Sequence, residues 1–406
     1  MSRPHPTPWR PIVVVFGLSL LLGACAGVQR PDPAPHELLE MDPMLVKADP
    51  DGVNATRTIV LDSSEIFTNA TDAFQRRQYD RAIEQYGQIL EHFADSKFYL
   101  PSLYNSGLSY ERLDRWEDAI NAYERVLEHS PGKPEATDAL YRMAECQSRM
   151  ARWKEVVAIT DRILDRSGLA TYDIVEAWTR RGDALFQLDD LAEAEKAYRA
   201  AMKANAQAPE GTGVPQDSHF VVAAEFGISR VYHKLFERVK FVLPVERMET
   251  DLEDKVQLFM QAQSNYIRVM RRGNPFWATA AGFHIGRMYE DFYTALLAAE
   301  VPDDLSREET DVYFAELRKQ IKPLMERALQ IYEKNIIMSE RYGINNDYTQ
   351  QTADALDRLK HYIVDDNLQA TEQARILRGE VPEIPGKPTD ERDQEKPALT
   401  PQPPLP

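Results

Sequence analysis

The chain has 406 residues, of which 43% are hydrophobic, so most of it can form a buried core. Its net charge is −17 at pH 7, and this acidic balance argues against a nucleic-acid backbone as the main partner, because phosphate binding needs a basic surface. Its two cysteines, Cys25 and Cys146, exclude a framework of several disulfides, and neither belongs to a CxxC metal motif.

The N-terminus is predicted to be a targeting segment. Basic residues precede an apolar run, residues 12–22, which is too short for a stable membrane anchor and typical of a signal peptide. The run ends in LGAC, which resembles the bacterial lipobox. That resemblance implies a signal peptide over residues 1–24 and acylation of Cys25. Because Ala26 follows, it also implies a lipid anchor in the outer membrane, facing the periplasm. An ordinary signal peptide with an incidental cysteine is the alternative.

Both ends of the mature chain are rich in proline. Residues 25–60 combine prolines with many acidic residues, and we expect them to form a flexible linker behind the acylated cysteine. Residues 377–406 contain eight prolines and many charges, and we expect a disordered or polyproline-type tail. That tail is either inert or a ligand for a partner.

Between these ends, a pattern of small residues recurs at a fixed period. Four frames start at Ala70, Gly107, Ala144 and Gly182, spaced by 37, 37 and 38 residues. In three of the four, an alanine follows twelve residues later and a tyrosine sixteen later, as Ala119 and Tyr123 follow Gly107. A fixed period of this size predicts a stack of helical hairpins.

The pattern resembles the tetratricopeptide repeat over residues 63–203. The resemblance implies an all-α fold, a TPR-like right-handed solenoid of antiparallel helical hairpins, with four repeats over residues 61–205. It also explains why a helix accepts Gly107, which costs about 1 kcal/mol relative to alanine. A small residue there allows the two helices of the hairpin to approach closely, and we expect the packing to offset the lost helix propensity.

The C-terminal half departs from this spacing. We expect two enlarged TPR-like hairpins over residues 206–345, one around Gly227 and one around Gly286, with insertions between their helices. Helices that extend beyond the hairpin would account for the insertions. Residues 346–376 read as an amphipathic helix that covers the last apolar face, as a helical array requires.

No catalytic motif is present in the sequence. HExxH, P-loop, GxGxxG and GxSxG patterns are absent, and the SxxK string at residues 130–133 falls on the closing turn of a repeat. We therefore predict no enzyme, no cofactor and no metal site, and we expect Cys146 to be a buried thiol. An enzyme would need a site divided across residues 205–345.

Partner binding is predicted on the first helices of the repeats, which line the concave groove in the family. Eight residues are expected to face that groove: Phe67, Phe74, Tyr104, Leu108, Arg112, Tyr141, Arg149 and Phe186. Aromatic rings with interspersed arginines suit an extended or helical peptide. The alternative is that the rings pack between neighbouring hairpins.

These features together predict a membrane-anchored scaffold that binds envelope proteins and helps to assemble or hold an envelope complex. The resemblance is compatible with four envelope processes for such a complex: β-barrel insertion, pilus secretin assembly, coordination of wall synthesis and gliding motility. The architecture is more similar to the gliding-motility TPR lipoproteins than to the shorter barrel-assembly ones. The alternative is a wall-binding or ligand-binding lipoprotein that uses its enlarged half, where aromatic residues gather over 274–293.

Overall fold

The computed structural model describes residues 44–48, 58–302 and 305–364. The predicted signal peptide, the acylated Cys25, most of the predicted linker, the last part of the predicted capping helix and the proline-rich tail lie outside these residues. The boundary between two compact units falls inside the third helix, after Ser102.

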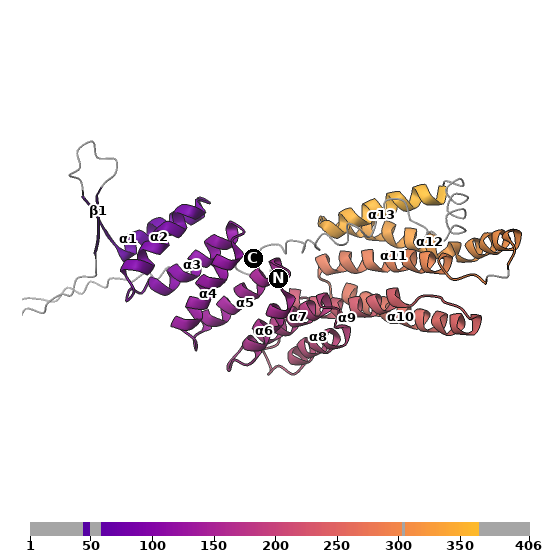
Figure 1. Ribbon diagram of the computed structural model, residues 1–406, viewed down its shortest axis with the longest axis horizontal. Helices are drawn as coiled ribbons and strands as arrows, with labels where there is room; N and C mark the ends of the chain where they lie inside the picture. Colours follow the sequence, from indigo (N-terminus) through magenta and orange to yellow (C-terminus); the bar gives the residue numbers. More distant parts are fainter. Residues whose placement is uncertain (1–43, 49–57, 303–304, 365–406) are drawn as a thin grey trace, which may run out of the picture. The chain divides into compact units, whose positions relative to one another are not determined.

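Helices make up nearly all of the described part of the chain (Figure 1). Their bounds are α1 Ser63–Gln75, α2 Tyr79–His92, α3 Tyr99–Arg112, α4 Trp116–His129, α5 Pro134–Arg149, α6 Trp153–Leu164, α7 Thr171–Gln187, α8 Leu191–Ala206, α9 His219–Arg238, α10 Val245–Arg271, α11 Pro275–Leu297, α12 Arg307–Tyr342 and α13 Asp347–Val364. The predicted all-α fold of TPR-like helical hairpins is confirmed.

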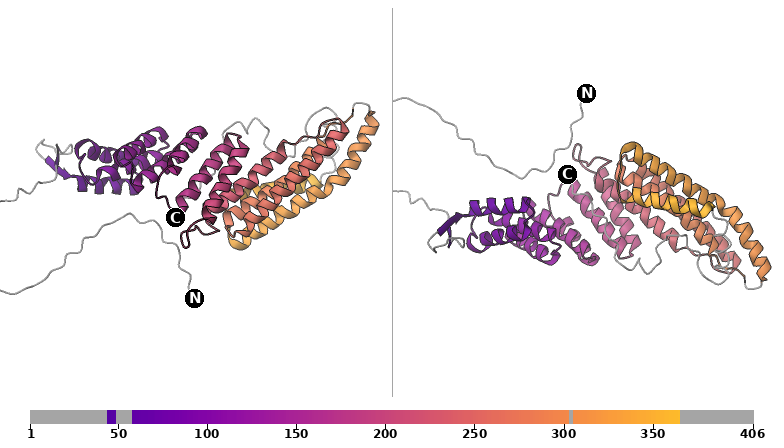
Figure 2. Two further views of the ribbon diagram at one scale, coloured as in Figure 1. Left: turned by 90° about the horizontal axis from the view of Figure 1, so that it is seen from below. Right: turned by 90° about the horizontal axis from the view of Figure 1, so that it is seen from above.

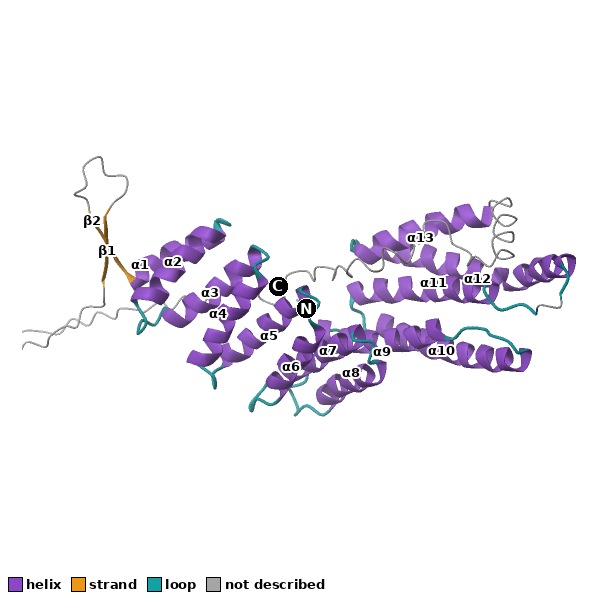
Figure 3. Cartoon of the chain, in the orientation of Figure 1, coloured by secondary structure: helices purple, strands orange, loops and turns teal. Residues whose placement is uncertain are grey.

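Two short strands precede the helices, within the segment where we expected a linker (Figure 3). Strand β1, Met44–Ala48, pairs antiparallel with β2, Thr58–Asp62. Both sequences, MLVKA and TIVLD, are rich in residues that favour strands. Sequence reasoning missed the pair because residues 49–57 connect the strands, a longer segment than the tight two-residue turns that mark a hairpin.

The four regular hairpins share one backbone turn. Each turns through a residue in the left-handed conformation, with φ between 54° and 66°: Arg77, Asp114, Ala151 and Asp189. These positions are spaced by 37, 37 and 38 residues, the same intervals as the small residues. None is glycine, so each carries a strain of roughly 1–2 kcal/mol. The turn offsets that strain by closing the helix end, as when Gln78 N–H donates to the Ala73 carbonyl at 2.9 Å.

Buried tyrosines of the second helices lie directly over glycines of the first helices. A Cβ atom on Gly107 would lie 2.5 Å from Cε1 of Tyr123, and one on Gly286 would lie 2.3 Å from the same atom of Tyr332. Both tyrosines are fully buried. The glycines therefore create the space that these rings fill, which accounts for glycine in mid-helix.

Longer helices build the enlarged half of the second unit. Helix α10 has 27 residues and α12 has 36, so the expected insertions are extensions of helices. Figure 2 shows α11 and α12, coloured orange, side by side in both views. Helix α13 packs against both, and its Ala355, Leu359 and Tyr362 are buried in their shared core. None of the described helices is both long and apolar enough to cross a membrane.

Candidate partner-binding surface

The structure places all eight predicted groove residues on first helices of the hairpins. Phe67 and Phe74 are on α1, Tyr104, Leu108 and Arg112 on α3, Tyr141 and Arg149 on α5, and Phe186 on α7. The α1 residues belong to the first unit, and the others belong to the second. Each set is therefore a candidate surface of its own unit.

The aromatic members of the set are half-buried and engaged with neighbouring residues. The ring of Phe67 stacks on that of Phe98, with centroids 4.9 Å apart. Tyr104 meets the edge of Tyr123 at 5.5 Å, and burial raises the pKa of Tyr104 to about 12. The hydroxyl of Tyr141 donates to the backbone carbonyl of Asp173, at the start of the next hairpin. These rings pack within and between hairpins, so only part of each ring is open to a partner.

Phe74 and Phe186 are also covered on one side. The ring of Phe74 meets Tyr79 edge-on at 5.5 Å, within the first unit. The guanidinium of Arg230 lies 4.0 Å from the centroid of Phe186, in the second unit. A cation placed over a ring at this distance is attracted by its π face. Phe186 therefore supports Arg230, which reaches it from the next first helix, α9.

Arginines are the accessible members of the predicted set. Arg112 and Arg149 are both exposed, and Leu108 between the rings is half-buried. Nε of Arg149 donates to Glu145 at 2.9 Å, one turn earlier in α5. In the second unit, the surface thus presents cationic groups beside partly covered apolar ones.

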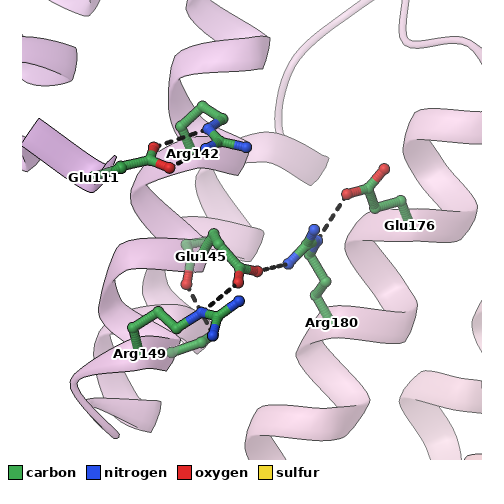
Figure 4. Close-up of polar contacts among 8 residues, drawn as sticks. Glu111, Arg142, Glu145, Arg149, Glu176 and Arg180 are labelled. Atoms are coloured by element: carbon green, nitrogen blue, oxygen red, sulfur yellow. Dashed lines mark hydrogen bonds and ion pairs between the residues drawn. The ribbon is translucent and has the colours of Figure 1, made fainter. Parts of the chain in front are cut away.

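Charged pairs link consecutive first helices, and sequence reasoning missed them. Figure 4 shows Arg142 of α5 meeting Glu111 of α3, with Nε donating at 2.8 Å. The hydroxyl of buried Tyr123 donates to the same Glu111 carboxylate at 2.6 Å. One carboxylate therefore joins three helices, α3, α4 and α5.

The next pair along the surface has the same form. Arg180 of α7 donates to Glu145 of α5 at 3.0 Å and to Glu176 of its own helix at 2.7 Å (Figure 4). Burial alone would raise the pKa of Glu145, but Arg180 and Arg149 hold it below its usual range. Burial dominates at Glu176, whose pKa is raised although Arg180 opposes the shift.

A weak sequence signal could have revealed these pairs. Arg142 and Arg180 both lie two residues before the small residue of their frames. Their partners occupy different positions, because Glu111 lies four residues after Gly107, whereas Glu145 lies one residue after Ala144. Position within the repeat thus places the two arginines, but it does not place the carboxylates that they meet. What it does not encode is that each arginine reaches back to the preceding first helix.

Two segments of the chain match models of the tetratricopeptide repeat, residues 101–133 and residues 175–207. The chain contains tetratricopeptide repeats. The matched segments hold the α3–α4 and α7–α8 hairpins. Tetratricopeptide repeats indicate a scaffold for protein–protein interactions, and neither match indicates a catalytic family.

Solved structures with similar helical hairpins include MamA, residues 41 to the end, from Desulfovibrio magneticus RS-1. It is 14% identical over 50% of this chain and 97% of that chain, with a TM-score of 0.34. A tetratricopeptide repeat protein from Parabacteroides merdae ATCC 43184 is 15% identical over 72% of this chain and 98% of that chain, with a TM-score of 0.36. No curated protein matches the sequence.

Two groups of the second unit bear on chemistry beyond partner binding. Cys146 is fully buried, as predicted, and burial raises the pKa of its thiol, so it behaves as a small apolar residue. His233, Glu237 and Asp291 come together at one point, with ligand-type atoms within 4.8 Å of one another. The sequence predicts no metal site here, and no spacing motif connects these three residues.

His219, at the start of α9, makes stability depend on pH. Its ring lies among Phe220, Phe276 and Trp277, and burial together with the nearby Arg180 lowers its pKa from 6.5 to about 4. Below pH 6.5 the unfolded chain takes up a proton that the folded chain refuses until about pH 4. The free energy of unfolding should therefore fall by up to about 2 kcal/mol between pH 7 and pH 5 through this group.

His219→Phe should remove that part of the pH dependence, because phenylalanine keeps the aromatic packing and cannot be protonated. Urea unfolding at pH 7 and pH 5, followed by circular dichroism, measures the difference between the two proteins. An equal loss of stability in both would contradict the assignment.

Proposed function

We propose that this protein is a lipid-anchored scaffold of the bacterial cell envelope that holds acidic segments of partner proteins on the first helices of its repeats. The observation that carries the proposal is the presence of tetratricopeptide repeats whose first helices expose Arg112 and Arg149 beside half-buried apolar side chains. Arginine is among the residues that contribute most to interface energy, and the planar guanidinium suits carboxylate partners.

The anchor and the location rest on the sequence. The LGAC sequence ending at Cys25 supports acylation, and several acyl chains give stable attachment because each buried CH₂ contributes about 0.8 kcal/mol. Ala26, the residue after the cysteine, supports a location in the outer membrane, with the repeats facing the periplasm. Among envelope processes, the resemblance to gliding-motility TPR lipoproteins supports a role in a gliding complex.

The alternative, a wall-binding or ligand-binding protein, has less support from the structure. Its main argument was the group of aromatic residues over 274–293. Of these, Phe283, Phe292 and Tyr293 are buried in the core between α11 and its neighbours, where they cannot contact a ligand. The scaffold remains the function that the geometry supports best.

A pair of charge-reversed variants tests the scaffold. We expect R112E/R149E to lower partner capture by about tenfold or more, since a loss of 1.4 kcal/mol is tenfold in affinity. The measurement is in-cell crosslinking followed by mass spectrometry of the captured proteins. The rings of the groove are left intact, because truncating Tyr104 or Tyr141 would also weaken the packing between helices.

The matched control is R162E/R199E, which makes the same charge change at exposed positions of second helices. Equal loss of capture in both variants would reduce the effect to net charge and would remove the groove from the proposal.

In a third variant, Cys25→Ser, we expect the protein to leave the membrane fraction while an added partner still binds. If that variant stays in the membrane fraction, the anchor is wrong and the groove is unaffected.

A further inference from the structure

Three side chains that can bind a metal meet between the first helices of the two enlarged hairpins. His233 and Glu237 lie one turn apart on α9, and Asp291 lies on α11. Nε2 of His233 is 3.7 Å from Oε1 of Glu237 and 3.7 Å from Oδ2 of Asp291. The ring nitrogen thus has a carboxylate oxygen on each of two sides.

The imidazole supplies a second, independent observation. His233 is only 5% exposed, and no group in the described part of the chain lies within hydrogen-bond distance of its Nε2. A buried polar atom without a partner destabilises the folded chain, because it loses its hydration and gains no hydrogen bond. Both carboxylates lie too far from Nε2 to accept a hydrogen bond from it, so the buried nitrogen is left beside two oxygen groups that could share a ligand with it.

The other ring nitrogen orients the imidazole toward that space. Nδ1 of His233 lies 3.2 Å from the hydroxyl of Tyr266, which is itself fully buried. With the proton on Nδ1, the ring donates to Tyr266 and turns the lone pair of Nε2 toward the two carboxylates. Histidine ligands of metals are held in this way by a hydrogen bond from their second nitrogen.

We propose that His233, Glu237 and Asp291 bind a divalent transition-metal ion of the zinc type. Ligand atoms about 2.0–2.2 Å from a tetrahedral zinc ion lie about 3.3–3.6 Å from one another, so the two separations of 3.7 Å need only a small inward movement. One nitrogen and two oxygens suit zinc better than Mg²⁺ or Ca²⁺, which prefer oxygen alone.

Exposure and charge agree with such a site. The side chain of Glu237 is 38% exposed, which leaves the ion a route to solvent and a position for a water ligand. Two carboxylates would neutralise its charge. One competing cation is Arg287, whose Nε lies 3.9 Å from Oδ2 of Asp291, beyond hydrogen-bond distance. Metal binding would therefore draw Asp291 away from a weak ion pair.

A bound ion would join α9 to α11, the first helices of consecutive hairpins. Because an ion that binds only the folded chain adds to its stability by mass action, zinc should raise the unfolding temperature of this half of the protein. The site would act as a cross-link within the scaffold, separate from the partner surface on α3, α5 and α7.

Zinc binding by the full-length chain, purified without a histidine tag, tests the proposal. Equilibrium dialysis against Zn²⁺, with the bound metal measured by mass spectrometry, should give one ion that Mg²⁺ in excess does not displace. His233→Gln, Asp291→Asn and Glu237→Gln should each lower the affinity by about tenfold or more. Co²⁺ in place of zinc should give visible absorption bands that the three variants lose.

The matched control is His361→Gln on α13. His361 lies 3.7 Å from the carboxylate of Asp357, the same separation as in the proposed site, but both side chains are exposed, and no third ligand joins them among the described residues. This variant should bind zinc like the natural chain. Glu237 is partly exposed, so Glu237→Gln should fold even if the buried variants do not. Absence of zinc from the natural chain, or equal binding by Glu237→Gln, would overturn the proposal.

Discussion

Gly227→Ala is expected to lower the free energy of unfolding by about 2 kcal/mol, although alanine is the better helix former. Alanine gains about 1 kcal/mol in helix propensity over glycine. Overpacking a filled core costs typically 1–3 kcal/mol and occasionally more, and the cost rises with the severity of the steric conflict. Here the conflict is severe, because a Cβ on Gly227 would lie 2.3 Å from Cζ of Tyr198. The packing term should therefore exceed the propensity term.

The ring of Tyr198 cannot move out of the way. Gly182 lies against it as well, and a Cβ there would be 2.6 Å from Cδ1 of the ring. The hydroxyl donates to Asp183 at 2.7 Å, which holds the far end. Tyr198 is thus confined by α7 and α9 together, and an added methyl group must displace one of these helices.

Urea unfolding of the Gly227→Ala protein measures this cost. The control is Gly87→Ala in α2, where no heavy atom lies within 4 Å of an added Cβ. That variant should be stabilised by up to about 1 kcal/mol. A second comparison makes Gly227→Ala in a Tyr198→Ala background, where the conflict is gone and the substitution should no longer destabilise. A free energy of unfolding of Gly227→Ala equal to that of the natural chain would contradict the packing argument.

The same tyrosine illustrates how far the sequence predicts the fold. The offset of sixteen residues between Gly182 and Tyr198 recurs in other repeats, and it identified the hairpins, their period and the small residue that admits the ring. The contact of Tyr198 with Gly227 has no such offset. It crosses from one hairpin to the next, and the helix bounds of the irregular half had to be known before it could be seen.

The candidate surface was predicted less completely, for a related reason. Periodicity places Tyr141 and Phe186 on the correct helices, but it does not say what lies over them. The covering groups, Arg230 among them, come from later hairpins. The proposed metal site also depends on a contact between hairpins, because Asp291 reaches His233 from the hairpin that follows the long α10. Contacts between hairpins depend on how far each helix extends, and that was the least regular feature of the sequence.

Glu290→Ala is expected to cost about 3 kcal/mol or more, because removing one partner of a buried charge pair leaves the other uncompensated. Glu290 of α11 is 2% exposed. It accepts hydrogen bonds from the hydroxyl of Tyr332 on α12 and from Arg358 on α13, the latter at 3.2 Å. One carboxylate therefore holds three helices together at the end of the array, as Glu111 does among α3, α4 and α5.

Glu111→Ala is the matched comparison, since Glu111 also joins a buried tyrosine to an arginine of the next first helix. The side chain of Arg142, its partner, is 36% exposed, whereas that of Arg358 is 19% exposed. An arginine closer to water recovers more hydration when its partner is lost, so Glu111→Ala should cost less than Glu290→Ala. Urea unfolding followed by circular dichroism gives both values, and the reverse order would contradict the role assigned to burial.

A double substitution separates the lost pair from the stranded charge. If the cost of Glu290→Ala comes mainly from leaving Arg358 uncompensated, then Glu290→Ala with Arg358→Met should be more stable than Glu290→Ala alone, because the unpaired cation is gone and the methionine can pack on α11. If the double variant is the less stable of the two, the cost lies in the hydrogen bond to Tyr332 and in lost packing. In that case, the carboxylate serves the tyrosine more than the arginine.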